Sequence, residues 1–151
     1  MTYEETLHYL YTSIPVFQHS GASAYKPGLG TSIALDDYLG NPHKAYKTIH
    51  VAGTNGKGSV SHLLAAILRQ SGFKVGLYTS PHLVDFRERI RVNGKKISQD
   101  YVVDFVERHR SFFEPLHPSF FELTSSMAFE YFRDQQVDYA VIEVGLGGRF
   151  G

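Results

Sequence analysis

A glycine-rich run in the first half of the sequence contains the residue types that can hold a phosphate chain. It reads Gly-Thr-Asn-Gly-Lys-Gly-Ser from residue 53 to residue 59. Glycines let a backbone turn tightly and approach a ligand closely, and amide N–H groups at the start of a helix favour negative charge. Lys57 adds a mobile cation for the β- and γ-phosphates, and the Ser59 hydroxyl can help to bind phosphate or magnesium. The run therefore predicts a polyphosphate site.

This run departs from the strict Walker phosphate-loop pattern at two positions. Val51 stands where that pattern has its first glycine, and Gly58 separates Lys57 from Ser59. A second interpretation is a glycine turn that only joins a strand to a helix. The motif by itself also leaves hydrolase, kinase and ligase open, because phosphoryl chemistry depends on the group that receives the phosphate.

A carboxylate near the end of the sequence is a candidate metal ligand. Residues 138–144 read as a buried central strand that carries Glu143 and continues into a second glycine-rich run, residues 145–149. Open α/β sheets place their ligands at the carboxyl ends of strands, where a hard oxygen ligand suits magnesium. An ordinary strand-end carboxylate is the alternative. The eight histidines show no metal-ligand spacing, so we expect them to be structural or exposed.

The elements around the phosphate run predict a parallel sheet. Residues 48–52 and 74–79 read as strands, and apolar residues at helical spacing lie between them, from Ser59 to a stop at Gly72. A strand, a helix and a strand in this order form the βαβ unit of a parallel sheet. Residues 89–97 alternate around Asn-Gly and predict a two-residue hairpin, which we expect to be a surface excursion.

Helices account for most of the remaining sequence. Thr2 and Glu5 form a capping-box pattern at the start of a short helix, and Ser98 can cap another. Thr31 or Ser32 can cap a third helix, which ends at Gly40-Asn41-Pro42. A fourth helix is predicted over residues 121–132.

Composition excludes several classes of protein. Of 151 residues, 42% are hydrophobic, which suits one ordinary domain, and 15 Lys plus Arg balance 15 Asp plus Glu. A chain without net charge has no overall field for nucleic acid or an anionic membrane. It contains no cysteine and no apolar stretch near the roughly 18 residues of a membrane-spanning helix. We therefore expect a soluble, cytoplasmic protein without nucleic-acid or membrane partners.

The Gly-Thr-Asn-Gly-Lys-Gly-Ser run resembles the phosphate loop of the Mur-ligase superfamily, which couples ATP cleavage to amide-bond formation. Four further segments, which are residues 78–83, 86–90, 120–123 and 141–149, are similar to folylpolyglutamate and dihydrofolate synthases. The resemblance covers about residues 47 to 149. It implies an α/β fold: a phosphate-loop-containing, parallel, Rossmann-like sheet flanked by helices, as a truncated part of the Mur-ligase central ATPase domain.

The resemblance also implies roles for individual residues. Ser80 and Glu143 are expected to bind Mg²⁺, and Lys57 is expected to be catalytic, although Ser80 before Pro81 is equally typical of a plain turn. The implied ATP-binding residues are Thr54, Asn55, Gly56, Lys57, Gly58 and Ser59. The implied folate-binding residues are Ser119, Phe120, Phe121 and Glu122, with a further folate-side loop around residues 20–23.

Two groups within these segments have an alternative interpretation. Phenylalanines at helical spacing, such as Phe120 and Phe121, belong more often to a core than to a ligand site. The charged residues Arg87, Glu88, Arg89 and Arg91 can be a substrate-facing cluster or a solvated face of the hairpin.

The activity implied by the resemblance is ATP-dependent addition of L-glutamate to folate or dihydropteroate through an acyl phosphate, as part of folate and one-carbon metabolism. We expect residues 1–151 to be a partial amino-terminal ATP-binding domain without the carboxyl-terminal glutamate ligase domain. Gly151 stands where the family continues with aspartate. The fragment is expected to be inactive alone, and the complete enzyme to be a monomer. The alternatives are a non-catalytic nucleotide-binding remnant or interaction module, and an amino-acid ligase of murein synthesis.

Overall fold

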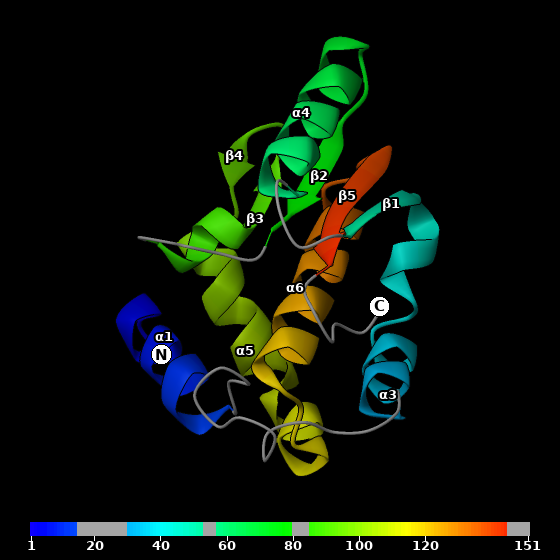
Figure 1. Ribbon diagram of the computed structural model, residues 1–151. Coiled ribbons are helices and arrows are strands. Elements are labelled where there is room, and N and C mark those ends of the chain that lie inside the picture. The colour runs from blue at the N-terminus through cyan, green and yellow to red at the C-terminus, as the bar shows by residue number, and fades with distance from the viewer. Residues whose placement is uncertain (15–29, 53–56, 80–84, 145–151) are drawn as a thin grey trace. The chain divides into compact units, whose positions relative to one another are not determined.

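The computed structural model describes residues 1–14, 30–52, 57–79 and 85–144 (Figure 1). The chain divides into two compact units. Unit 1 combines Met1–Gly40 with Ser98–Met127, and unit 2 combines Asn41–Ile97 with Ala128–Gly151. Unit 2 contains the sheet, whereas unit 1 is helical.

Unit 2 is built on a five-stranded mixed sheet with the strand order β1-β5-β2-β3-β4. The three strands β1, β5 and β2 are parallel, and β3 and β4 extend the sheet as antiparallel strands. The strands are β1 Lys47–Ala52, β2 Val75–Tyr78, β3 Ile90–Val92, β4 Lys95–Lys96 and β5 Tyr139–Val144. The predicted strands are therefore present. The expectation that the hairpin is a surface excursion was wrong, because β3 pairs with β2.

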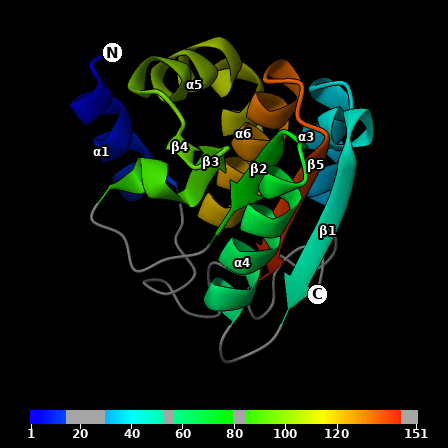
Figure 2. The ribbon, with the colours of Figure 1, turned by 90° about the horizontal axis from the view of Figure 1, so that it is seen from above.

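Helix α4, Lys57–Gln70, makes the crossover between β1 and β2. Figures 1 and 2 show this helix lying along one face of the sheet. Val75, Leu77 and Val141 form a buried cluster on that face, and Leu64 and Leu68 of α4 pack against them. Strand β5 lies between β1 and β2, so residues late in the sequence form the middle of the parallel part.

The opposite face of the sheet carries the second half of α6, Phe120–Asp134 (Figure 2). A Cβ atom built on Gly76 of β2 would lie 2.6 Å from the Phe132 ring, closer than real side chains approach. Glycine at position 76 therefore lets this helix sit directly on the strand. Tyr46, next to the short helix η2, Pro42–Ala45, donates a hydrogen bond from its hydroxyl to the Phe129 carbonyl at 3.1 Å.

The hairpin turn has the geometry that Asn-Gly predicts. Asn93 and Gly94 have φ angles of 48° and 80°, which a type I′ turn requires at both central positions. The Asn93 side-chain oxygen accepts a hydrogen bond from the Val75 N–H at 2.9 Å, so the turn is fastened to the start of β2. This contact joins the hairpin to the sheet.

Unit 1 is formed by helices, and α1 and α5 begin at side-chain caps. Its elements are α1 Tyr3–Ser13, α3 Gly30–Tyr38, α5 Gln99–Phe113, η4 Glu114–Leu116 and the first half of α6. The predicted capping box of Thr2 and Glu5 is confirmed, as is the Ser98 cap, which accepts from the Tyr101 N–H at 3.1 Å. The predicted cap of α3 was wrong. This helix begins at Gly30, and Ser32 lies inside it, buried.

Aromatic contacts and hydrogen bonds hold the helices of unit 1 together. Tyr38 at the end of α3 stacks on Phe112 of α5 with ring centroids 3.9 Å apart. Tyr9 of α1 donates a hydrogen bond to Glu114 at 2.7 Å, and the Arg110 guanidinium lies over the Tyr9 ring. In the described ranges, no helix combines the length and the apolar character needed to cross a membrane.

Candidate functional site

Three strand ends define the candidate site in unit 2. Strands β1, β5 and β2 are parallel, so their carboxyl ends lie at the same edge of the sheet, with Ala52 opposite Val144. The predicted phosphate run follows β1, the predicted serine ligand follows β2, and the second glycine run follows β5. All three predicted segments therefore begin at the same edge of the sheet, which is where open α/β sheets bind ligands.

Glu143 is the buried acidic side chain at this edge. It lies next to the last residue of β5, and only 3% of its surface is exposed. Side chains alternate along a strand, so Glu143 is on the same face as Val141, which packs under α4. A carboxylate on this face points toward the helix that follows the phosphate run.

The first turn of α4 lies beside the Glu143 carboxylate. A Cβ atom built on Gly58, the second residue of the helix, would lie 3.9 Å from Glu143 Oε2. The N-terminus of a helix carries partial positive charge and presents free N–H groups. The structure thus brings together a helix start that suits phosphate and a carboxylate oxygen that suits a hard cation.

The structure places only some of the predicted residues of this site. Gly58 and Ser59 lie in the first turn of α4, where Ser59 is exposed, and Lys57 is its first residue. The Lys57 side chain lies outside what the structure describes. So do Thr54, Asn55, Gly56 and Ser80, together with the loop around residues 20–23.

Thr79 is a buried residue at the site that the sequence did not single out. It follows β2 directly, is 7% exposed and donates its backbone N–H to the Arg89 carbonyl at 2.9 Å. This bond continues the pairing of β2 with the hairpin as far as the residue before Ser80. The alternation of residues 89–97 predicts a strand in this region but not its pairing with β2, so the sequence held no signal for this bond.

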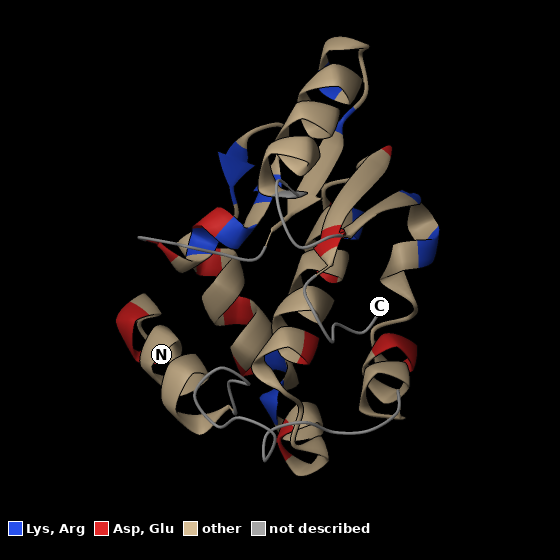
Figure 3. Cartoon of the chain, in the orientation of Figure 1, with Lys and Arg blue, Asp and Glu red and all other residues tan. Residues whose placement is uncertain are grey.

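Charged residues of the hairpin and of the segment before it contact one another. Asp85 caps the short helix η3, Phe86–Arg89, and its carboxylate lies 3.3 Å from the Arg87 guanidinium and 3.5 Å from the Lys96 ammonium. Arg91 donates to the Glu88 carbonyl at 3.3 Å. Figure 3 shows these blue and red segments beside the end of the sheet. Their contacts favour a structural role over a substrate-facing one.

The predicted folate-binding residues lie in unit 1, at the start of α6. Ser119 and Glu122 form a reciprocal cap: the Glu122 N–H donates to Ser119 Oγ at 3.1 Å, and the Ser119 N–H donates to Glu122 Oε1 at 2.9 Å. Ser32 of α3 donates to the other carboxylate oxygen, Oε2, at 3.0 Å. The buried Glu122 carboxylate thus accepts hydrogen bonds from Ser119 and Ser32, both of which belong to its own unit.

The two phenylalanines between these caps differ in exposure. Phe120 is buried and stacks on Tyr11 with ring centroids 5.1 Å apart. Phe121 is partly exposed. Phe120 therefore has the core position that the alternative interpretation gave it, and Phe121 is the ring of the pair with accessible surface.

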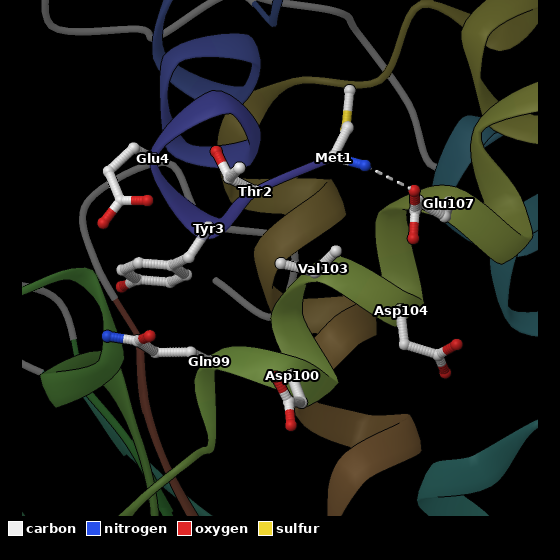
Figure 4. A pocket seen from close by; sticks show the side chains of 9 residues that line it. All are labelled: Met1, Thr2, Tyr3, Glu4, Gln99, Asp100, Val103, Asp104 and Glu107. Atoms are coloured by element: carbon white, nitrogen blue, oxygen red, sulfur yellow. Dashed lines mark hydrogen bonds and ion pairs between the residues drawn. The ribbon is translucent and has the colours of Figure 1, made fainter.

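A hollow in unit 1 lies between the starts of α1 and α5 (Figure 4). Its acidic lining residues are Glu4, Asp100, Asp104 and Glu107. The amino terminus of Met1 donates to Glu107 at 2.8 Å, and this interaction raises the pKa of the amino group. No predicted site residue lines the hollow. Over the described part of the chain, no three His, Asp or Glu side chains gather in a way that could hold a metal ion.

The parallel βαβ core, with a helix start and a buried carboxylate at its carboxyl edge, defines the class. It is an α/β protein with a candidate ligand site at the edge of its sheet. No protein-family model matches the chain. Comparison with known proteins gives the family.

Curated relatives and solved structures agree on that family. A dihydrofolate synthase/folylpolyglutamate synthase of Bacillus subtilis is 42% identical over 132 residues, which cover 83% of the chain and 31% of the relative. A probable bifunctional folylpolyglutamate synthase/dihydropteroate synthase of Haloferax volcanii is 41% identical over 155 aligned residues, which cover 98% of the chain and 17% of the relative. The chain thus spans less than a third of each relative.

The structural neighbours have the same fold. The crystal structure of folylpolyglutamate synthase from Thermotoga maritima is 48% identical with a TM-score of 0.84, and the match covers 97% of the chain and 34% of that structure. An FPGS–AMPPCP–folate complex is 38% identical with a TM-score of 0.83, covering 97% and 36%. The chain belongs to the folylpolyglutamate synthase/dihydrofolate synthase family and corresponds to about one third of the solved members.

Proposed function

We propose that the chain is the nucleotide-binding part of an ATP-dependent ligase that adds L-glutamate to a folate, as a folylpolyglutamate synthase, a dihydrofolate synthase or both. The observation that carries this proposal is the meeting of the α4 start with the Glu143 carboxylate at the carboxyl edge of three parallel strands. A related protein that was solved with AMPPCP and folate supports the ligand classes.

The phosphates of ATP are assigned to the helix start and the run before it. Thr54, Asn55, Gly56, Gly58 and Ser59 would supply backbone N–H groups and hydroxyls to the phosphates, and the Lys57 ammonium would bind the β- and γ-phosphates. This assignment is supported by the position of the run, which begins after β1 and ends in α4. A helix dipole directed at the phosphates adds to the attraction.

Mg²⁺ is assigned to Ser80 and Glu143. The donor set fits this ion, because a carboxylate and a hydroxyl are hard oxygen ligands and Mg²⁺ prefers few protein ligands next to phosphate oxygens. Glu143 is nearly fully buried at the sheet edge, which suits a carboxylate that is charged when a cation is bound. When bound, the ion neutralises charge on the transferred phosphoryl group.

The proposed reaction has two steps. The carboxylate of dihydropteroate, or of a folyl glutamate tail, attacks the γ-phosphorus of ATP, and ADP leaves with the electrons of the broken P–O bond. The product is an acyl phosphate. The amino group of L-glutamate attacks its carbonyl carbon, loses a proton and displaces inorganic phosphate, which forms the amide. The Lys57 ammonium stabilises the negative charge on the oxygens of the transferred group.

The folate is assigned to the start of α6. Ser119, Phe120, Phe121 and Glu122 are the proposed contacts, and Phe121 supplies the accessible ring for a pterin. Glu122 and Ser119 hold the helix start in place through their reciprocal cap. We further propose that the full-length enzyme is a monomer in the cytoplasm. The chain contains no cysteine, so it needs no disulfide bonds, which are rare in that reducing compartment.

A second candidate is a non-catalytic nucleotide-binding remnant or interaction module. The chain spans 17% and 31% of the two curated relatives described above. A remnant would bind MgATP without forming product. An amino-acid ligase of murein synthesis is disfavoured by the relatives, which are folate enzymes.

Calorimetric titration of the chain with MgATP tests the proposal. We expect binding by the unaltered chain, loss of at least tenfold in affinity for Lys57→Ala and for Glu143→Gln, and no change for Lys44→Ala, which removes an exposed lysine of η2. Absence of MgATP binding by the unaltered chain would overturn the assignment. Formation of dihydrofolate from labelled ATP, dihydropteroate and glutamate would exclude the second candidate, because a remnant binds MgATP without forming product.

A further inference from the structure

A buried serine of unit 1 reaches from one helix to another. Ser32, the third residue of α3, is 4% exposed and donates its hydroxyl to Glu122 Oε2 at 3.0 Å, across 90 residues of sequence. Other hydroxyls in the described ranges donate to a carbonyl three or four residues back in their own segment, as Thr6, Thr12, Ser71, Thr124 and Ser125 do. Such a local bond joins no two elements, whereas the Ser32 bond joins α3 to α6.

The Glu122 carboxylate is held from two directions. Its Oε1 atom accepts a hydrogen bond from the Ser119 N–H at 2.9 Å, as part of the reciprocal cap of α6, and its Oε2 atom accepts from Ser32. Only 9% of Glu122 is exposed, and a buried charge needs hydrogen-bond donors to offset its lost hydration. Without the Ser32 hydroxyl, we expect the carboxylate to turn toward water and to draw Oε1 away from Ser119.

The serine is carried by a helix that has a second anchor. Tyr38, at the other end of α3, stacks on Phe112 of α5 with ring centroids 3.9 Å apart, and its hydroxyl lies 3.1 Å from His109 Nδ1. Helix α3 is therefore held on α5 by Tyr38 and on α6 by Ser32. A donor on a supported helix can fix the orientation of the group that it contacts.

The group whose position depends on this network is the Phe121 ring. Phe121 lies between Ser119 and Glu122 in the first turn of α6, and it is partly exposed. The first turn of a helix has no internal partners for its N–H groups, so its order depends on the cap. A ring that stacks on a flat ligand must keep its plane, since a small misplacement weakens the contact.

We propose that Ser32 is a positioning residue for folate binding. It acts through Glu122: the hydroxyl holds the carboxylate, the carboxylate holds the cap with Ser119, and the cap holds Phe121 in place for a pterin. This inference rests on the proposed function, because the position of Phe121 matters only if a pterin binds at the start of α6. Ser32 needs no contact with the ligand for this role.

The inference predicts a selective loss of binding for Ser32→Ala. The affinity for dihydropteroate, measured by calorimetry, falls about tenfold, which is the effect of one hydrogen bond to a charged group. The affinity for MgATP is unchanged, because the phosphate run and Glu143 belong to unit 2. An unchanged affinity for dihydropteroate would overturn the inference.

Thr6→Val is the matched control. Thr6 is a fully buried residue of α1 in the same unit, and its hydroxyl donates to the Thr2 carbonyl at 2.8 Å. This variant removes a hydroxyl whose bond does not involve Glu122. We expect it to lower the melting temperature and to leave both affinities unchanged. Equal losses of dihydropteroate affinity in Thr6→Val and Ser32→Ala would overturn the inference, because binding would then follow stability alone.

A double variant tests whether Ser32 acts through Glu122. Glu122→Ala should weaken dihydropteroate binding, and the addition of Ser32→Ala should cause no further loss, because the serine then has no carboxylate to hold. Additive losses would overturn the inference.

Two further measurements complete the test. Ser32→Cys keeps a weaker donor of similar size, so it should have an intermediate affinity, and it replaces Ser32→Ala if circular dichroism shows that variant unfolded. An affinity of Ser32→Cys equal to that of the unaltered chain would then overturn the inference. Absence of dihydropteroate binding by the unaltered chain would overturn the inference together with the folate assignment, whereas the MgATP assignment would stand.

Discussion

At the residue scale, two buried carboxylates have different surroundings. Glu122 accepts hydrogen bonds from the Ser119 N–H and the Ser32 hydroxyl, and all of these groups belong to unit 1. Glu143 lies at the carboxyl edge of the sheet in unit 2, beside the start of α4. The first carboxylate stabilises a helix start, and the second is placed where ligands of α/β proteins bind.

The pair of Tyr9 and Glu114 gives a prediction about pH. The hydrogen bond from Tyr9 is the largest cause that lowers the pKa of Glu114 below its ordinary value of 4.5, and Arg110 contributes further. A lowered pKa in the folded state means that the contribution to stability is present above the ordinary value and is lost as the pH falls. We expect Tyr9→Phe to make the free energy of unfolding decrease less steeply between about pH 5 and pH 3.

Urea denaturation at a series of pH values measures this slope. Tyr11→Phe is the control, since Tyr11 is an exposed tyrosine on the same helix and makes a ring contact with Phe120. Identical slopes for Tyr9→Phe and the unaltered chain would contradict the assigned cause. A reduced slope in both variants would point to a general effect of tyrosine loss.

Sequence patterns predicted the positions of the candidate site residues to different extents. Glu143 could be predicted from the strand that carries it and from the glycine run after it, because both signals are local. Ser119 and Glu122 have the spacing of a capping box, Ser-x-x-Glu, so their structural role was also visible in the sequence. The position of Gly58 opposite Glu143 was not visible, because 85 residues separate the two and only the sheet topology brings them together.

At the element scale, the contact between β2 and α6 depends on Gly76. We expect Gly76→Ala to destabilise the chain by about 1–3 kcal/mol, the usual cost of overpacking a core. The Phe132 ring is fully buried and would have to move away from the new methyl group. The free energy of unfolding in urea measures the cost.

A second substitution identifies the clash as the cause. Phe132→Leu alone should destabilise the chain by leaving a cavity. Combined with Gly76→Ala, it should cost less than the sum of the single variants, because the smaller side chain leaves room for the methyl group. Strict additivity of the two effects would show that the ring contact is not the source of the strain.

The outer face of α4 is unusually apolar for a helix at the surface. Val60, Leu63 and Ile67 follow one another at helical spacing and are 52%, 63% and 51% exposed. Figure 3 shows this helix with few charged residues. Because neighbouring exposed apolar side chains favour association, we expect Leu63→Lys to raise the protein concentration at which light scattering detects aggregates.

An exposed residue of unit 1 provides the comparison for this prediction. Ile33 of α3 is 54% exposed, so Ile33→Lys adds the same charge at a similarly exposed position. We expect a smaller effect from this control, since added charge acts in both variants and the apolar stripe is interrupted only in Leu63→Lys. Equal effects would attribute the gain to net charge alone.

The elements themselves were largely predictable because their signals are short. Caps at Thr2 and Ser98 and the Asn93-Gly94 turn gave the starts of two helices and the hairpin. The partner of the hairpin was not predictable, since pairing of β3 with β2 depends on residues far from the turn. The prediction that Ser32 caps α3 was wrong, because Ser32 lies inside the helix. Its hydroxyl donates instead to Glu122, ninety residues away.

At the scale of the whole molecule, the sequence order and the spatial order of the strands differ. Among the described strands, β5 comes last in the sequence and lies between the first two, β1 and β2. Local periodicity predicts strands but not their neighbours, so this order could be expected only from the resemblance. The division into two units is equally non-local, because each unit combines two separate stretches of chain.

The central position of β5 has a consequence for synthesis on the ribosome. Neither β1 nor β2 has its parallel partner until residues 139–144 have left the exit tunnel, about ninety residues after β1. At about 5–20 residues per second, this delay lasts several seconds. During that time the nascent chain exposes two strands with open edges, so a chaperone that covers them should act between the emergence of β1 and that of β5.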